Sequence, residues 1–432
     1  MKQKIDFVND DARKSLFRMV MPLFVAMILM LAYNLVDSVW VGNLLGENGY
    51  AALTTAGSVS ILLYAITMGI GNGTSVIVSQ SVGAGDRKRT NEMISTSLLM
   101  SAIFAIAVII LLECFLDRLL LVFQTPLAIY ADARNYLAIF LIGYVAIFLY
   151  MQLTSIYRSF GDSLFQMKGM LLGTIFNVIA DPLFIMWLDI SGAAIATVLS
   201  QILCLVFAII YGKKKGYFQL TVKGIDAKKA AQILKMVIPS CIQNCTPAIS
   251  SMVMVILVNQ FDVTTIAAYG VVKNIENILF YPAMAMNMAL ITIIGQLYGA
   301  KCYDKMKDYR KVALTYGILI EAVLTGIVLL FSRQISMAFV REPTIADIVS
   351  HGLLIIGVGY LCYMATNIFT AKMAGTGKVN LSMVIMFIYY IVIRVPLAIV
   401  LIRSSLQLDG MWIAILASHL IATLMAYIID KK

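Results

Sequence analysis

The chain has 432 residues, of which 61% are hydrophobic and 13% are charged, and its mean hydropathy is +0.90. A soluble globular protein of this length needs a largely polar surface, so this composition excludes that class. The formal net charge of +10 does not indicate nucleic-acid binding, because the basic residues are spread between apolar stretches.

Twelve apolar stretches follow one another, each close to the roughly 20 residues that cross a bilayer core as a helix. In the first half the predicted spans are 16–40, 53–80, 93–115, 131–155, 164–188 and 191–211. In the second half they are 232–259, 266–297, 311–331, 347–371, 380–402 and 409–429. The short alternating segments of a membrane β-barrel are missing from the sequence. The predicted fold class is therefore all-α: a polytopic membrane protein with twelve transmembrane helices.

The second six spans repeat the first with an offset of about 216 residues. Gln80-Ser81-Val82-Gly83-Ala84 returns as Gln296-Leu297-Tyr298-Gly299-Ala300, and Pro22 returns as Pro239. Because each copy has an even number of spans, both copies start from the same membrane face. We expect two six-helix bundles related by a pseudo-two-fold axis along the membrane normal. The predicted domains are an N-terminal bundle over 1–211, a basic cytoplasmic linker over 212–231 and a C-terminal bundle over 232–432.

Most of the 33 Lys and Arg residues lie on one side of the predicted spans. The loops of the other side hold only Arg118, Arg134, Arg333, Arg341 and Arg403. This asymmetry predicts cytoplasmic N- and C-termini, and we expect a bacterial inner membrane location. The linker contains Lys213, Lys214, Lys215, Lys223, Lys228 and Lys229. It is either a solvated connection or, over 225–236, a helix that lies on anionic lipid.

Two carboxylates lie within predicted spans of the first half. Asp37 shares a helix face with Tyr33, which is four residues earlier. Asp181 follows Asn177 by four residues and directly precedes Pro182, which frees a backbone carbonyl one turn earlier. A carboxylate at membrane depth costs several kcal/mol unless it is paired, protonated or bound to a cation. These residues therefore predict a site for Na⁺ or for a shared proton.

Thr197, four residues before Gln201 on the next span, adds a hydroxyl to this candidate site. The alternatives are that Asp37 lies in water at the outer interface, and that Asn177 and Thr197 make ordinary interhelical hydrogen bonds. In the second copy Met254 and Val395 stand where Asp37 and Asp181 stand in the first. We therefore expect buried acidic charge, and the coupling ion, in the first half only.

These elements resemble the multidrug and toxic compound extrusion (MATE) family over essentially the whole chain. The resemblance rests on Pro22, on Asp37 before Val41-Gly42, on Asn177-x-x-x-Asp181-Pro182, on Gly192-Ala-Ala-Ile-Ala-Thr197 with Gln201, and on the repeated Gln-x-x-Gly-Ala. It implies a V-shaped scaffold that exports bulky, often cationic compounds against entry of H⁺ or Na⁺. It also implies a cation-coupling cluster that consists of Tyr33, Asp37, Asn177, Asp181 and Thr197. The hinges that it implies are Pro22 and Pro182.

One branch of that family, which exports norfloxacin, uses a Glu in span 7 and an Asp in span 10. The corresponding stretches here, 240–247 and 360–367, contain no acid. The chain therefore resembles the branch named for the DNA-damage-inducible protein F, in which coupling belongs to the N-terminal half.

Other polar residues at membrane depth have simpler interpretations. Lys273 and Glu276 are three residues apart and predict an ion pair, with a cargo contact as the alternative. Arg394 is either paired or extends towards the interface, and His419 is expected to be a satisfied hydrogen-bonding group. The predicted walls of a substrate cavity are flexible or aromatic side chains, namely Met27, Met30, Met284, Met286 and Tyr363.

No sequence pattern indicates covalent catalysis, since P-loop, G-x-S-x-G and metal-spaced His motifs are missing. We therefore predict no enzyme activity, no catalytic residue, no cofactor and no metal apart from a possible Na⁺ at Asp37, Asn177, Asp181 and Thr197. The expected partners are small-molecule substrates and the lipid bilayer, without nucleic acid, and the chain is expected to be a monomer.

The predicted function is secondary active efflux of bulky, often cationic compounds in exchange for inward Na⁺ or H⁺. One alternative is a flippase of the same superfamily for lipid-linked oligosaccharides or peptidoglycan precursors, which needs more basic residues in its cavity. A passive channel or a structural membrane protein is the third class, and the acids within the spans and the paired six-span halves speak against it.

Overall fold

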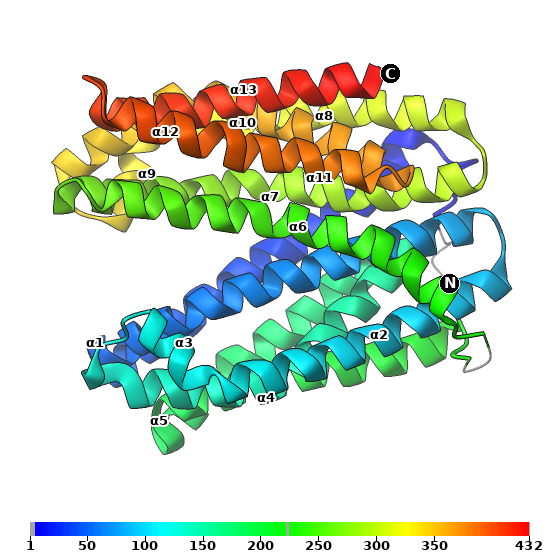
Figure 1. Ribbon diagram of the computed structural model, residues 1–432, viewed down its shortest axis with the longest axis horizontal. Helices are drawn as coiled ribbons and strands as arrows, with labels where there is room; N and C mark the ends of the chain where they lie inside the picture. The colour runs from blue at the N-terminus through cyan, green and yellow to red at the C-terminus, as the bar shows by residue number, and fades with distance from the viewer. Residues whose placement is uncertain (1–4, 222–223, 432) are drawn as a thin grey trace. The chain divides into compact units, whose positions relative to one another are not determined.

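The computed structural model describes residues 5–221 and 224–431, and these residues form helices without any β-strand (Figure 1). Lys223 of the predicted linker lies outside the described residues. Ten of the described helices are long and apolar enough to cross a membrane. Two of the ten, α1 and α5, are each interrupted by non-helical backbone and hold two predicted spans apiece. The predicted all-α, multi-span fold class is confirmed.

The first six helices are α1 (Ala12–Gly83), α2 (Arg87–Cys114), α3 (Leu116–Val122), α4 (Leu127–Ser159), α5 (Leu164–Lys215) and α6 (Ala227–Val258). They are followed by α7 (Val263–Gly299), α8 (Tyr303–Leu330), α9 (Ser332–Phe339) and α10 (Pro343–Gly375). The last span consists of α11 (Val379–Phe387), a π-helical segment (Ile388–Arg394) and α12 (Val395–Ile402), and α13 (Gln407–Lys431) ends the described chain.

α1 and α5 each consist of two helices that meet at a short stretch of non-helical backbone. In α1 the break is at Gly46, whose φ of 70° and ψ of −159° suit a residue without a Cβ. In α5 the break is at Leu188 and Asp189, and Asp189 takes a φ of 50°. Asp tolerates this left-handed region better than most residues. Each break therefore reverses the chain without a loop.

The described chain divides into two compact units. The first unit contains Met21–Cys241, and the second contains Asp6–Val20 together with the chain from Ile242 onward. The chain thus passes between units inside α1, beside Pro22, and inside α6, two residues after Pro239. The two prolines are repeat counterparts, so the repeat is preserved at both crossing points.

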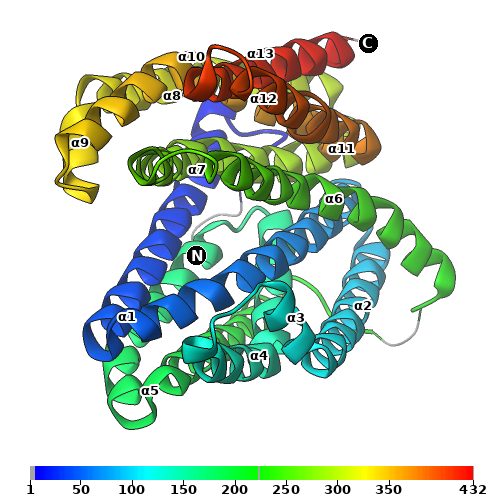
Figure 2. The ribbon, with the colours of Figure 1, turned by 60° about the vertical axis from the view of Figure 1, so that its left-hand side comes forward.

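In the first unit, α4 supplies the core against which α2 and α5 pack (Figure 2). Its buried aromatic residues recur every four positions and form one face: Tyr136, Phe140, Tyr144 and Phe148. Tyr144 also fixes α1, because its hydroxyl donates to the backbone oxygen of Leu63 at 3.0 Å. In this way α4 holds α1 and α5, the two helices that carry the predicted acids.

In the second unit, α10 is the central helix and packs against α7, α8 and α13. Trp412 of α13 is fully buried, and its ring stacks on Tyr269 of α7 with 5.9 Å between centroids. Gly352 of α10 leaves room for that indole, since a Cβ there would lie 2.8 Å from it. Three helices thus meet around one aromatic pair.

The sequence repeat is visible in the turns that end equivalent helices. Gly161 and Gly377 have φ values of 85° and 86°, and their amides donate to the carbonyl three residues earlier at 2.8 Å in both copies. A side chain at such a φ is strained, which explains why glycine returns at both positions. The likeness of the two halves therefore extends to single hydrogen bonds.

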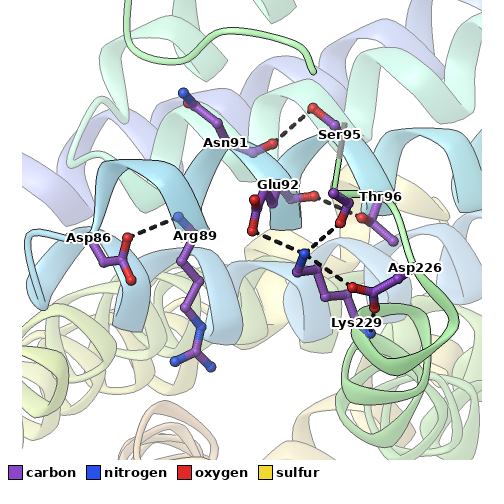
Figure 3. Close-up of polar contacts among 9 residues, drawn as sticks. Asp86, Arg89, Asn91, Glu92, Ser95, Thr96, Asp226 and Lys229 are labelled. Atoms are coloured by element: carbon purple, nitrogen blue, oxygen red, sulfur yellow. Dashed lines mark hydrogen bonds and ion pairs between the residues drawn. The ribbon is translucent and has the colours of Figure 1, made fainter. Parts of the chain in front are cut away.

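The described part of the connection after α5 is bound to the start of α2 (Figure 3). The amide of Thr221 donates to Ser95 Oγ at 3.0 Å. Lys229 Nζ lies 3.0 Å from Glu92 Oε2 and 3.2 Å from Asp226 Oδ2. The amide hydrogen bond from Lys229 lowers the pKa of Asp226. The predicted helix over 225–236 is the beginning of α6, and its contact with lipid stays a prediction.

Candidate functional site

The residues of the predicted coupling cluster lie together inside the first unit. Asp37 is on the first part of α1, Asn177 and Asp181 are on the first part of α5, and Thr197 follows the break in α5. Asp37 is only 7% exposed, and Asp181 is completely enclosed. The alternative in which Asp37 lies in water is therefore not supported by its burial.

The carboxyl groups of Asp37 and Asp181 lie close enough to interact with each other. Asn177 Nδ2 donates to Asp181 Oδ1 at 2.7 Å, as expected for residues four apart on one helix face. The hydroxyl of Tyr33 lies 3.1 Å from Ser200 Oγ and beside Thr197. All five predicted residues are thus brought together, and the two acids form a pair.

Four buried oxygen atoms of this cluster have no hydrogen-bond partner among the described residues. They are Asp37 Oδ1, Asn177 Oδ1, Asp181 Oδ2 and Thr197 Oγ1. Buried polar atoms are normally satisfied, so a group of unsatisfied oxygens at one place calls for an explanation. Two adjacent carboxylates repel each other unless they share a proton or hold a cation. Carboxylate, amide and hydroxyl oxygens also suit a hard cation such as Na⁺.

Sequence reasoning missed some of the surroundings of this pair. The phenols of Tyr64 and Tyr136 lie within electrostatic reach of Asp37. Ser200, the partner of Tyr33, is 167 residues away from it in the chain. Ser200 is detectable from its spacing to Thr197 on the same helix. Tyr136 comes from α4, and no local pattern connects that helix to the acids.

The predicted hinge and cavity residues are distributed over both units. Pro22 lies in α1 at the unit boundary, and Pro182 lies inside α5 next to Asp181. In the first unit Met27 is buried and Met30 half-buried. In the second unit Met286 and Tyr363 are buried and Met284 is half-buried. Tyr363 stacks on Phe280 with 4.0 Å between ring centroids.

The interior of the second unit contains a hydrogen-bonded charged group. Lys273 Nζ and Glu276 Oε2 form the predicted ion pair at 3.0 Å. Arg394 is buried, and its guanidinium donates to Ser418 Oγ at 3.0 Å and to Tyr389 Oη at 2.9 Å. His419 Nδ1 lies 2.6 Å from the same Tyr389 hydroxyl. Arg394 is therefore hydrogen-bonded inside the unit, and His419 is satisfied as predicted.

The expectation that buried acids occur in the first half only is wrong. Glu276 is 1% exposed and Glu321 of α8 is completely enclosed, both in the second unit. Glu321 lies inside the predicted span 311–331, so a search of each span for acids would have found it. The repeat comparison missed it because it tested only the counterparts of Asp37 and Asp181.

Comparison with known proteins agrees with this architecture. The profile of the MatE family matches twice, over residues 22–183 and 239–400. The probable multidrug resistance protein YoeA of Bacillus subtilis (strain 168) is 26% identical over 96% of this chain and 92% of its own. The FAD transporter of Shewanella oneidensis is 22% identical over 92% of this chain and 90% of its own.

Among solved structures, the MATE transporter VcmN of Vibrio cholerae superposes with a TM-score of 0.93. It is 20% identical, and the match covers 97% of this chain and 96% of that one. At this identity the likeness shows the fold alone. The family profile, in contrast, matches both halves of the sequence and well over half of its length. The chain belongs to the MATE family of membrane transporters.

Proposed function

We propose that this protein is a secondary active exporter that expels bulky, often cationic organic compounds in exchange for inward Na⁺ or H⁺. The observation that carries the proposal is the buried pair Asp37 and Asp181 with its unsatisfied oxygens. Such a pair is tolerable in a membrane interior when a cation or proton occupies it. Membership of the MATE family supports a transport function but does not identify the coupling ion.

Entry of a cation can supply the energy for export. A positive ion that moves inward is worth about 2.3 kcal/mol per 100 mV of membrane potential. We infer that ion binding at Asp37 and Asp181 rearranges the first part of α1 and releases cargo. Pro22 is suited to the role of hinge because a proline removes one backbone hydrogen bond from the helix. It also lies where α1 passes from one compact unit to the other. Pro182 would loosen α5 beside Asp181 in the same way.

Several further assignments belong to the same proposal. The domains are an N-terminal coupling bundle, the basic connection and a C-terminal bundle, with Met27, Met30, Met284, Met286 and Tyr363 in contact with cargo. The apolar helices and the family make the chain a multi-pass membrane protein. Its proposed location is a bacterial cytoplasmic membrane, with both termini inside. It acts as a monomer, and its coupling resembles that of the DNA-damage-inducible protein F branch.

The flippase alternative is not favoured. A pyrophosphate headgroup needs basic side chains that are free to bind it. Lys273 is paired with Glu276, and Arg394 is hydrogen-bonded to Ser418 and Tyr389. Both basic residues at membrane depth are therefore engaged within the second unit.

The test is transport by purified protein in proteoliposomes, with Na⁺ and pH gradients imposed separately. The panel contains cationic dyes, bile salts as apolar anions, and flavin adenine dinucleotide as a polar anion. We expect cationic dyes to accumulate against their gradient only when one of the two ion gradients is imposed. Accumulation of no cargo under either gradient, or dye flux without any gradient, would contradict the proposal.

A further inference from the structure

Glu321 has no role in the site described above, and its surroundings are unusual for an acid. It lies on α8, whose outward face carries Leu319 and Val323, 57% and 54% exposed. Glu321 itself is on the opposite face with 0% exposure. Neither carboxylate oxygen has a hydrogen-bond partner among the described residues. A buried carboxyl group without partners is costly in its charged form, so it calls for a bound cation or proton.

Two further hydroxyl groups near Glu321 are also unsatisfied. Thr325 is one turn along the same face of α8, and its buried Oγ1 has no partner among the described residues. Tyr360 is on α10, which packs against α8, and its buried hydroxyl is likewise unpartnered within the described chain. The phenol of Tyr360 lies within electrostatic reach of Glu321. A carboxyl group and two hydroxyl groups thus share one buried region of the second unit.

The charged neighbours come from the other elements around α10. Tyr360 is also within electrostatic reach of Glu276 on α7 and of Arg394 in the π-helical segment. Lys273 neutralises Glu276, while no described carboxylate lies within ion-pair distance of Arg394. Together with Glu321, these three charged side chains have a net charge of +1 when Glu321 is protonated. Their net charge is zero when Glu321 is ionised.

The chemistry of the region favours a proton over Na⁺. A sodium ion needs several oxygen ligands, and at the first-unit site Pro182 frees a backbone carbonyl for that purpose. Helix α8 contains no proline and no break, so its carbonyls remain bonded within the helix. Three side chains on two helices are few ligands for a metal cation. They are sufficient for a proton that moves between a carboxyl group and hydroxyl groups.

We propose that Glu321 is a second proton-binding site, in the second unit, which gains and loses one proton in each transport cycle with the hydroxyls of Thr325 and Tyr360 as its partners. The proton comes from hydronium in the water on one side of the membrane, so that the carboxyl O–H bond forms as a hydronium O–H bond breaks. On the other side the reverse transfer returns the proton to water. The coupling of this proton to the transport cycle rests on the proposed antiport. The gain and loss of a proton by Glu321 as pH changes do not depend on that proposal.

The first test is infrared spectroscopy of the full-length protein in lipid, with the pH raised in steps. We expect the carbonyl band of a buried protonated carboxylic acid to lose intensity, and Glu321→Gln to remove that component. Glu47→Gln, which changes an exposed acid in α1, is the matched control and should leave the band unchanged. Titrating intensity that is the same in Glu321→Gln and wild type would overturn the proposal.

The second test counts the protons that enter per cargo molecule in proteoliposomes. We expect the count to fall by one in Glu321→Gln and to recover in Glu321→Asp, which keeps the carboxyl group. If Glu321→Gln does not fold, wild-type protein is treated with a hydrophobic carbodiimide, which modifies protonated carboxyl groups in apolar surroundings. Labelling of Glu321 that decreases as pH rises, without protection by Na⁺, supports a proton site. Protection by Na⁺, or absence of labelling, contradicts it.

The failures of the two proposals are distinguishable. If wild-type protein accumulates no cargo under any gradient, the antiport proposal fails while the infrared titration still decides the state of Glu321. If wild-type protein exports cargo but Glu321→Gln keeps both the proton count and the titrating band, only the second proton site fails.

Discussion

Asp181→Asn is expected to abolish gradient-driven export while leaving the protein folded and inserted. Asn has nearly the same shape as Asp, and its side-chain oxygen still accepts from Asn177 Nδ2, which lies 2.7 Å from Asp181 Oδ1. The substitution removes the charge on which the proposed cation site with Asp37 depends. Loss of one coupled ion at 100 mV removes about 2.3 kcal/mol, which corresponds to about a fifty-fold lower accumulation ratio.

The measurement is dye accumulation in proteoliposomes at matched protein content, with thermal stability and elution volume as checks on folding. The matched control is Asp189→Asn, which makes the same substitution at an exposed position of the same helix. Asn also tolerates the φ of 50° found there. Full accumulation in Asp181→Asn, or an equal loss in Asp189→Asn, would show that the buried pair does not couple export.

The geometry of the coupling cluster was predictable where it depends on a single helix. Tyr33 with Asp37, and Asn177 with Asp181, are each four residues apart, and the helical period puts such residues on one face. The structure adds the relations between helices, such as the 3.1 Å contact of the Tyr33 hydroxyl with Ser200 Oγ and the place of Tyr136 within electrostatic reach of Asp37. Those relations depend on how α1, α4 and α5 pack, and hydropathy carries no information on that packing.

The helices themselves were predictable because the bilayer sets their length and satisfies no backbone hydrogen bond. The places where one span turns into the next were predictable to within a few residues. The breaks at Gly46 and at Leu188 and Asp189 lie in or next to the gaps 41–52 and 189–190 between the predicted spans. Gly46 is marked by its residue type, whereas Leu188 and Asp189 are neither glycine nor proline. The repeat is preserved in the paired turns at Gly161 and Gly377, yet comparison of the two copies did not reveal Glu321, whose counterpart in the first copy is Ala105. In this chain the two copies thus share these backbone turns but not this buried acid.

The second large effect is expected from Gly73→Ala, which should destabilise the first unit. Gly69 and Gly73 lie four residues apart on α1, where the backbone of α6 approaches most closely. A Cβ at Gly73 would lie 2.6 Å from the Cα of Val237 and 2.9 Å from the carbonyl oxygen of Met236. Both are backbone atoms that cannot rotate away, so the two helices must separate. Small residues at this spacing allow such close approach in membrane proteins.

The balance of two opposing effects decides the sign of this change. Alanine favours a helix over glycine by about 1 kcal/mol. Forcing an extra carbon into a tight contact costs about 1–3 kcal/mol, and the cost is at the upper end when neighbouring backbone must move. We therefore expect a lower melting temperature and a lower yield of monodisperse protein. Gly57→Ala is the control on the same helix, because no atom lies within 4 Å of a Cβ added there. Gly57→Ala should be neutral or slightly stabilising, and equal melting temperatures for the two variants would show that α1 and α6 do not depend on this close contact.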